Sequence, residues 1–316
     1  MAVTFKVTVT SCDMKISVII CTRNRFDDFT KTLLSVAAQT RLPDELIVVD
    51  SSDENKLEVY LTSVKLPFPV RYFHTQPGLT LQRNHGIREC ASDLIFFFDD
   101  DVDLDKNYLA EVEKVFISDI GHEIGAVGGR IIKQIPPSAR LKFEGFVFGV
   151  LRFAFGVVGT HNGKFYPSGM PSHPRKNQPS GFIECLSGCG MAFRREVFEK
   201  AKFDEALAHY GLMEDVDISK QTLDAGYKIY YQTSATLVHN ESPMNRLKVQ
   251  QWAEMSVVNY DYLFRKSWGK DSWRWLFYYW ALIGLFAANF HSLKGLKGTF
   301  AGVKRIVGHA FSVTSR

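Results

Sequence analysis

The sequence predicts an α/β fold in which a mostly parallel sheet is flanked by helices. Three short segments are almost continuous runs of apolar residues, at positions 16–21, 46–49 and 94–98. Such runs are typical of strands that are buried on both faces of a parallel sheet. Helical patterns lie between and after these runs, and strand, helix, strand, helix is the order expected of a doubly wound α/β domain.

The helices follow from the spacing of their apolar residues. In segment 26–36 the apolar side chains recur every three or four positions, as on one face of a helix. Helical patterns recur at residues 80–89 and 106–116, the second behind Asp105 as a candidate N-cap. An irregular stretch rich in aromatic residues, Gly and Pro then covers residues 129–181, and long irregular segments are usually functional loops. Helical and strand patterns resume at 194–201, 215–225 and 228–231.

Composition excludes a disordered or disulfide-stapled chain. The protein has 316 residues, of which 46% are hydrophobic and 23% charged, which is enough to bury a large core. An odd number of cysteines in so long a chain predicts reduced thiols and a cytosolic compartment; they are Cys12, Cys21, Cys90, Cys185 and Cys189. The first 14 residues lack the apolar core of a secretory signal, so we expect no export.

The C-terminal part differs from the rest in charge and hydropathy. Residues 241–316 hold 11 Lys and Arg against 4 Asp and Glu, a balance of +7, which leaves −3 for residues 1–240. Segment 275–290 has no charge in 16 residues, short of the roughly 20 needed to span a bilayer. Segment 293–307 interleaves apolar residues with Lys and Arg. We expect a helical region that lies on the cytoplasmic face of the plasma (inner) membrane, peripheral or monotopic; a spanning helix and packing in a homodimer are the alternatives. No nucleic-acid-binding motif occurs.

Polar clusters follow directly on the three predicted strands. They lie at residues 22–25, 50–53 and 99–101. Because open α/β sheets bind ligands at the carboxyl ends of their strands, the three clusters should converge on one crevice. The first turn, CTRNR, contains no glycine, which argues against dinucleotide binding and against a P-loop. Asp50 could accept hydrogen bonds from a ribose hydroxyl or a base; an ordinary turn aspartate is the plainer explanation.

The three adjacent aspartates are the sharpest signal in the sequence. Carboxylates so close together repel one another, and a divalent cation would neutralise them. In extended backbone Asp99 and Asp101 project to one side and form a pincer, while Asp100 points away. Carboxylate oxygens suit Mg²⁺ or Mn²⁺. The alternative is a solvated acidic turn.

Taken together, the motifs resemble those of the family 2 glycosyltransferases with the GT-A fold, and in particular bacterial polysaccharide and rhamnosyltransferase-like members. The resemblance rests on the order and spacing of SVIICTRNR, IVVDSSD, GLTLQRNHGI, FFFDDDVDLDKNYL, SGCGMAFRREVF and MEDVDISKQTLDAGYKIYY, over about residues 15–240. It implies an N-terminal extension at 1–13, a GT-A catalytic domain at 14–245 and the helical region at 246–316.

The resemblance also implies roles for individual residues. The donor nucleotide sugar would be bound by Thr22, Arg23, Asn24, Asp50, Arg83, Asn84, Asp99 and Asp100. Asp99 and Asp101 resemble the DxD metal motif, with His239 as a further ligand. Glu214 and Asp215 are similar to the family's ED pair, whose Asp is the catalytic base. The acceptor-side loop would be Gly188, Cys189, Gly190 and Met191.

The implied reaction is inverting transfer of a sugar from a nucleotide-diphosphate donor to a hydroxyl of a glycan or lipid-linked acceptor, with Mg²⁺ or Mn²⁺ as cofactor. A cation would stabilise the departing diphosphate, and a carboxylate would take the acceptor proton. A nucleotidyltransferase and a non-catalytic carbohydrate-binding or assembly protein on a degenerate fold are the alternatives. Plainer explanations exist for single residues: Asp215 as an acid at a helix start, His239 as a hydrogen-bonded strand end, and Arg83 as a surface cation.

Overall fold

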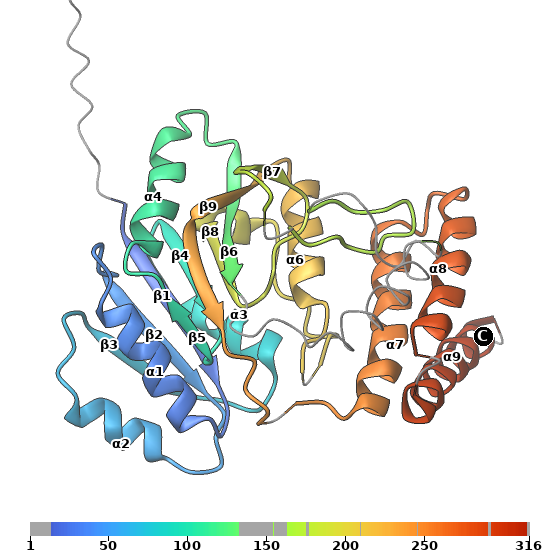
Figure 1. The fold of residues 1–316 in the computed structure, drawn as a ribbon, viewed down its shortest axis with the longest axis horizontal. Helices are drawn as coiled ribbons and strands as arrows, with labels where there is room; N and C mark the ends of the chain where they lie inside the picture. Colours follow the sequence, from blue (N-terminus) through green and yellow to red (C-terminus); the bar gives the residue numbers. More distant parts are fainter. Residues whose placement is uncertain are drawn as a thin grey trace, which may run out of the picture.

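The structure is a computed structural model that describes residues 14–132, 154, 163–174, 177–208, 210–244, 246–289 and 292–314, with side chains through residue 308. Its centre is a mixed sheet with strand order β3-β2-β1-β4-β8-β6-β9-β5, and β7 pairs with β9 beside this path. Helices cover the sheet, and three further helices lie together at the C-terminal end (Figure 1). Two predicted features lie wholly or partly outside the described residues: the extension at 1–13 and, apart from Ala154, residues 133–162 of the irregular stretch.

The first half of the chain is the parallel part of the sheet. Its elements are β1 (Ile16–Thr22), α1 (Phe26–Ala37), β2 (Glu45–Asp50), α2 (Lys56–Ser63), β3 (Val70–His74), α3 (Leu79–Glu89) and β4 (Leu94–Phe98). β1 lies between β2 and β4 and pairs in parallel with both, and β2 pairs in parallel with β3. The three predicted strands and the helices α1 and α3 are confirmed. α2 and β3 were not predicted, because α2 buries only Leu57 and no residue of β3 is fully buried.

The second half adds antiparallel strands. Its elements are β5 (Val102–Leu104), α4 (Tyr108–Ser118), β6 (Ile124–Ile132), β7 (Gly181–Ile183), β8 (Gly190–Arg194), the 3₁₀ helix η1 (Arg195–Glu199), α6 (Glu214–Asp224) and β9 (Lys228–His239). β8 runs antiparallel to both β4 and β6, and β5 runs antiparallel to β9. The helix expected at 194–201 is therefore only the short η1, and the strand expected at 228–231 is the beginning of a strand of 12 residues.

Both faces of the central strands are buried, which explains the continuous apolar runs. Side chains alternate along β1: Val18 belongs to the core under α1 and α4, and Ile19 to the core under α3 and α6. β4 divides in the same way, with Phe96 in the first core and Phe97 in the second. Because strand side chains alternate between faces, a run without polar residues is needed to fill both cores.

The C-terminal region consists of α7 (Val249–Ser267), α8 (Arg274–Asn289) and α9 (Leu293–Thr314). These helices lie together at the end of the molecule away from α1 and α2 (Figure 1). α7 is bonded to the sheet domain: Asn259 donates to the Leu212 carbonyl at 2.7 Å, and Lys266 pairs with the buried Asp217 at 2.8 Å. None of the helices described is both long and apolar enough to cross a bilayer.

Candidate functional site

The site is a cavity of about 580 Å³ at the carboxyl ends of the parallel strands. All three predicted polar clusters contribute to its lining, through Thr22 at the end of β1, Ser51 after β2 and Asp99 after β4. The acceptor-side loop and the start of α6 supply the other wall, with Gly188 and Asp215. The convergence on one crevice expected from the strand ends is therefore present. The parallel register of β1 with β2 and β4 brings the clusters to one edge.

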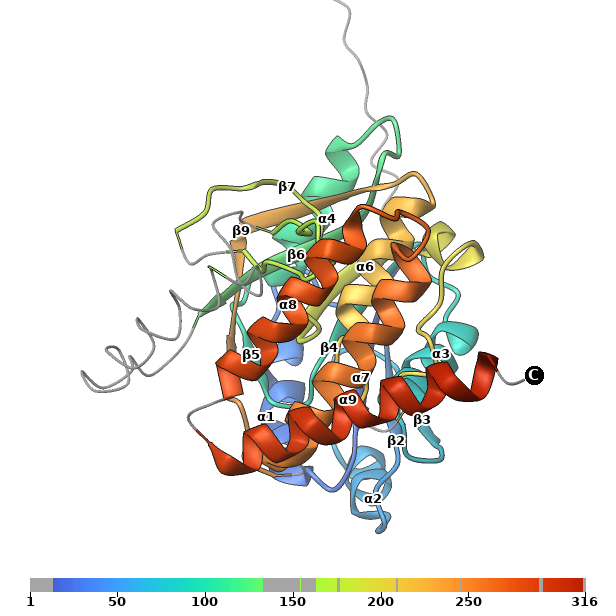
Figure 2. The same ribbon diagram turned by 90° about the vertical axis from the view of Figure 1, so that its right-hand side faces the viewer.

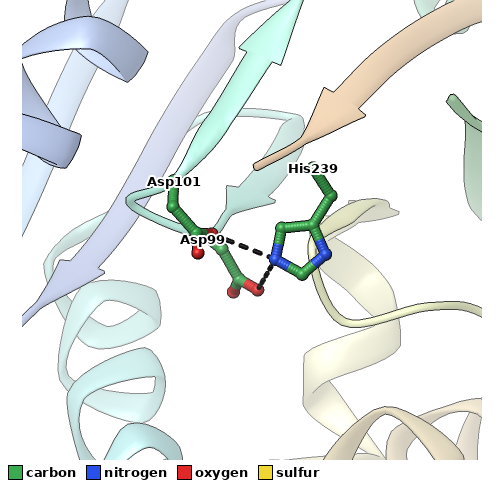
Figure 3. A group of neighbouring side chains, drawn as sticks. All are labelled: Asp99, Asp101 and His239. Atoms are coloured by element: carbon green, nitrogen blue, oxygen red, sulfur yellow. Dashed lines mark ion pairs between the residues drawn. The ribbon is translucent and has the colours of Figure 1, made fainter. Parts of the chain in front are cut away.

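Asp99, Asp101 and His239 form a cluster at the cavity wall, in which Asp99 and His239 line the cavity and Asp101 is buried behind them. Their ligand atoms all lie within 4.8 Å of one another. His239 Nε2 is 3.0 Å from Asp101 Oδ1 and 3.9 Å from Asp99 Oδ2, and the three side chains point toward one another in Figure 3. His239 is the last residue of β9 and lies opposite Val102 of β5 in the antiparallel pairing. That pairing brings a histidine to two carboxylates that lie 138 and 140 positions earlier in the sequence.

Asp99 and Asp101 come together through a different backbone conformation from the predicted one. Residues 100 and 101 lie in a turn between β4 and β5 rather than in extended backbone. Asp99 and Asp101 nevertheless meet, while Asp100 turns toward β1, where its carboxylate accepts from Thr22 Oγ1 at 2.7 Å and Arg25 Nη1 at 2.9 Å. Burial raises the pKa of Asp100 to about 7, against the opposing effect of Arg25.

The negative charge of the acidic turn at residues 99–101 is offset by Arg25. Arg25 Nη1 lies 2.9 Å from Asp100 and 3.6 Å from Asp101. Burial alone would raise the pKa of Asp101, but a hydrogen bond and the charge of His239 hold it below its ordinary value. Arg25 was not among the predicted site residues. Its place in the turn directly after β1 is the signal that could have identified it.

Arg83 is buried beneath the cavity, and it does not line the cavity as the predicted diphosphate contact would. Its residue is only 1% exposed. Nη2 donates to Asp99 Oδ1 at 3.1 Å and to the Gly188 carbonyl at 2.9 Å, while Nη1 forms an ion pair with Glu214 Oε1. The guanidinium also faces the rings of Phe97 and Phe203, 5.9 and 5.2 Å from their centroids. One side chain thus ties together three segments of the cavity wall.

Asn84, the other residue expected near the diphosphate, is also structural. Its amide nitrogen donates to the Phe203 carbonyl at 2.8 Å and to Glu205 Oε1 at 2.9 Å. It is absent from the cavity lining. Asn84 of α3 therefore holds the segment after η1 in place, and the contacts with the nucleotide-sugar donor must come from other residues.

Glu214 and Asp215 begin α6 but have different environments. Glu214 is buried against Arg83; burial raises its pKa to about 8, and the Arg83 charge opposes that rise. Both residues line the cavity, but Glu214 is buried whereas Asp215 is partly exposed. Its Oδ2 accepts from the Gly188 backbone N–H at 3.0 Å and its Oδ1 from the Val216 N–H at 2.9 Å. Asp215 is therefore the carboxylate of the pair that is oriented and within reach of a bound molecule.

The acceptor-side loop divides at Cys189. Gly188 and Cys189 line the cavity, whereas Gly190 and Met191 belong to β8 and the core behind it. A Cβ on Gly188 would lie 2.6 Å from Glu214 Oε1, so the close approach of loop and helix requires glycine there. A Cβ on Gly190 would instead meet Leu237 of β9 at 2.4 Å, which is a packing constraint.

On the β1 and β2 side, Thr22 and Arg23 line the cavity, but Asn24 and Asp50 do not. Asn24 has φ of 53° and exchanges hydrogen bonds with Asp53, which closes the turn. Asp50 is fully buried and accepts from Ser52 N at 2.8 Å and from Tyr72 Oη at 3.1 Å. The predicted contact of Asp50 with a base or ribose is thus not supported by its orientation. Its neighbour, Ser51, reaches the cavity instead.

The hydroxyl of Ser51 is buried, and no group in the described part of the chain forms a hydrogen bond with it. A buried hydroxyl without a partner is costly, and in a cavity wall it is a natural contact for a ligand. Sequence reasoning missed Ser51 because Asp50, one position earlier, carries the stronger chemical signal.

The segment after β9 covers the same end of the cavity. Ser242 N donates to Asp101 Oδ2 at 2.9 Å, and Arg25 Nε donates to the Met244 carbonyl at 3.1 Å. Arg246 and Leu247 then line the cavity. Arg246 adds a third arginine to the lining, after Arg23 and Arg25, and nothing in the sequence around it had marked it as a site residue.

Comparisons with known proteins agree with this geometry. Residues 17–201 match the family model described as Glycosyl transferase family 2. The chain is 35% identical over 88 residues to the uncharacterized glycosyltransferase YwdF of Bacillus subtilis, covering 28% of this chain and 33% of that protein. It is 26% identical over 248 residues to the O-antigen biosynthesis protein RfbC of Myxococcus xanthus, covering 73% of this chain and 18% of that protein. It is 25% identical over 226 residues to the O-antigen chain rhamnosyltransferase WbaN of Salmonella anatum, covering 70% of this chain and 64% of that protein. The chain thus matches only a minor part of the length of YwdF and RfbC.

Solved structures confirm the expected GT-A fold. The S. aureus TarS fragment 1–349 in complex with UDP-GlcNAc superposes with a TM-score of 0.55 at 16% identity, over 87% of this chain and 73% of that one. The mannosyltransferase PcManGT of Pyrobaculum calidifontis, in complex with GDP-Man and Mn²⁺, superposes with a TM-score of 0.54 at 18% identity, over 95% and 81%.

Proposed function

The chain belongs to glycosyl transferase family 2, and from that premise we propose that it transfers a sugar from a nucleoside-diphosphate sugar to a hydroxyl group, with inversion at the anomeric carbon. The observation that carries the proposal is one cavity lined both by Asp99 and His239 of the acidic cluster and by the partly exposed Asp215. The departing diphosphate needs positive charge to stabilise it, and the attacking hydroxyl needs a base to take its proton. We assign the first role to a cation held by the cluster and the second to Asp215.

The acidic cluster fits a divalent cation. Its ligand atoms lie within 4.8 Å of one another and comprise two carboxylates and one imidazole. Carboxylates suit Mg²⁺ and Mn²⁺, and the imidazole favours Mn²⁺ of the two. When bound, such an ion stabilises the negative charge that develops on the departing diphosphate. The complex of PcManGT with GDP-Man and Mn²⁺ supports this assignment.

Asp215 is the proposed base. The Gly188 N–H holds its Oδ2 at 3.0 Å and the Val216 N–H holds its Oδ1 at 2.9 Å, so the carboxylate is oriented before an acceptor binds. A carboxylate in this position accepts the proton of the acceptor hydroxyl as that oxygen attacks. Because attack comes from the face opposite the leaving diphosphate, one base gives inversion. Glu214 supports this arrangement from beneath, through Arg83.

The donor is proposed to bind along the β1 and β2 side of the cavity. Thr22 and Ser51 offer hydroxyls there, and Arg23 and Arg246 offer cations for the diphosphate. The names of the relatives RfbC and WbaN favour a rhamnosyl or hexosyl donor and an acceptor of bacterial surface polysaccharide, either a glycan or a lipid-linked oligosaccharide.

The test is release of nucleoside diphosphate from UDP-, dTDP- and GDP-sugars by the wild-type protein, Asp215→Asn and Asp224→Asn. Asp224 is the matched control, because it lies at the exposed end of the same helix. We expect Asp215→Asn to lower kcat by at least about 100-fold, with donor affinity retained. Asp224→Asn should match the wild type. Full turnover by Asp215→Asn would refute the assignment of the base.

A further inference from the structure

The outward side of α9 carries one stripe in which apolar and basic residues alternate. Leu293, Phe300 and Val307 are exposed large apolar residues seven positions apart. Lys297 and Lys304 are also exposed and lie between them. Steps of four and three residues keep all five side chains on one side of a helix. This stripe, together with Leu276 and Ile283 of α8, is called the outer face below.

The inner sides of α8 and α9 are already occupied. Tyr278, Ala281 and Leu285 of α8 are buried in one cluster with Val257 and Phe264 of α7, and Val303 and Ile306 of α9 pack against it. Phe286 of α8 meets Phe300 of α9 at 4.9 Å between ring centroids, so the two helices share an edge. Figure 2 views this end of the molecule directly, with α8 and α9 in front of α7. Within the described residues, the outer face is therefore the side of α8 and α9 that stays exposed.

Its apolar side chains are well exposed: the exposed fraction is 72% for Leu276, 79% for Leu293 and 63% for Phe300. The charge of the region is of one sign, because residues 272–314 contain five Lys or Arg and no Asp or Glu. From this combination we infer that the outer face binds an anionic lipid surface, with α8 and α9 lying in the plane of the headgroups. The apolar residues enter the acyl boundary while the lysines contact lipid phosphates.

Two other occupants fit less well. In a two-fold dimer through this face, the same patch of each subunit would meet its copy. The lysines of one stripe, Lys297 and Lys304, would then face the lysines of the other and repel them, because neither stripe contains an acidic residue. A spanning helix needs about 20 apolar residues, whereas α8 has 16 and ends at Asn289. The described helices include none that could cross a bilayer.

The outer face is one helix away from the candidate active site. α7 packs against α8 and α9 on one side, and on the other its Asn259 donates to the carbonyl of Leu212, which lines the cavity. Lys266 of α7 also holds Asp217 of the helix that begins with Glu214. A protein docked by this face would hold its cavity close to the membrane, where a lipid-linked acceptor would be found.

The experiment is sedimentation of the full-length protein with vesicles of phosphatidylcholine alone or with phosphatidylglycerol added, for the wild type and three double variants. Lys297→Glu/Lys304→Glu removes the basic part of the stripe, and Leu293→Ser/Phe300→Ser removes the apolar part. Lys31→Glu/Lys65→Glu is the matched control, because both lysines are exposed and lie near the other end of the molecule. Circular dichroism and size exclusion report folding and oligomeric state for each protein.

We expect the wild type to bind phosphatidylglycerol vesicles and not pure phosphatidylcholine, and to be released by salt. Each stripe variant should lose at least about tenfold in vesicle affinity, while the control should bind as the wild type does. Equal binding by the wild type and both folded stripe variants would overturn the proposal. A wild-type dimer that becomes monomeric in Leu293→Ser/Phe300→Ser would overturn it too, as would binding that resists alkaline carbonate, the behaviour of a spanning segment.

Discussion

Replacing Arg83 by Met is the change whose cost follows most directly from the structure. The guanidinium is 1% exposed and bonds Asp99, the Gly188 carbonyl and Glu214. Methionine keeps much of the side-chain volume against the rings of Phe97 and Phe203 but leaves those acceptors without a donor. The single variant therefore isolates the loss of charge from the loss of packing.

The magnitude follows from burial. At pH 9, above the pKa of about 8 that burial gives Glu214, removing one partner of this buried ion pair costs about 3–5 kcal/mol, because the remaining charge is left uncompensated. That free energy corresponds to roughly two to four powers of ten in the unfolding equilibrium constant. Glu214→Gln in the Arg83→Met background removes the charge left beneath the loop. We expect the double variant to regain roughly half of the lost stability, so the two substitutions should be strongly non-additive.

Urea unfolding of the wild type, both single variants and the double variant completes the cycle, with unchanged m-values as the check on two-state behaviour. Arg88→Met is the control, since Arg88 is exposed on the same helix, and it should change stability by less than about 0.5 kcal/mol. Turnover should stay low in the double variant, because Asp99 and the Gly188 loop remain without their common donor. A cost below about 1 kcal/mol for Arg83→Met, or additive single effects, would refute the reasoning.

Two further substitutions separate stability from binding. Gly188→Ala places a Cβ 2.6 Å from Glu214 Oε1 and should cost about 1–3 kcal/mol in urea unfolding, together with most of the turnover. Gly181→Ala is the control: its Cβ meets no atom within 4 Å, so neither stability nor turnover should change. Equal effects of the two substitutions would contradict the close-approach argument. Ser51→Ala removes a buried hydroxyl without a described partner, so stability should be unchanged while calorimetry records roughly fivefold weaker nucleotide binding; unaltered affinity would remove Ser51 from the donor site.

The strand-end rule placed the cavity correctly, but it could not orient individual side chains. Continuous apolar runs identified β1, β2 and β4, and each of the three polar clusters at their ends contributes at least one residue to the cavity lining. Asp50 and Ser51 are adjacent, yet the first turns inward to Ser52 and Tyr72 and the second faces the cavity. That choice depends on the twist of one turn, which residue type alone does not encode.

The sequence also could not predict which residues far apart in the chain meet in the folded protein. Arg83 is a polar residue on a helix with weak amphipathicity, and only the tertiary structure reveals that Glu214 and Gly188 meet it. β6 and β8 escaped prediction because glycines interrupt β6 and a glycine begins β8, where a Cβ on Gly190 would meet Leu237. The antiparallel β5–β9 pairing likewise carries His239 to Asp101.

The most direct test of the account is a thermal-shift panel of UDP, dTDP and GDP with Mn²⁺ or EDTA, on the wild type, Asp101→Ala and Asp103→Ala. Asp103 is the matched control, because it is exposed on β5 two residues beyond Asp101. The account predicts that one nucleotide raises the Tm only with Mn²⁺, in the wild type and the control but not in Asp101→Ala. Equal shifts in EDTA, or a full shift in folded Asp101→Ala, would contradict it.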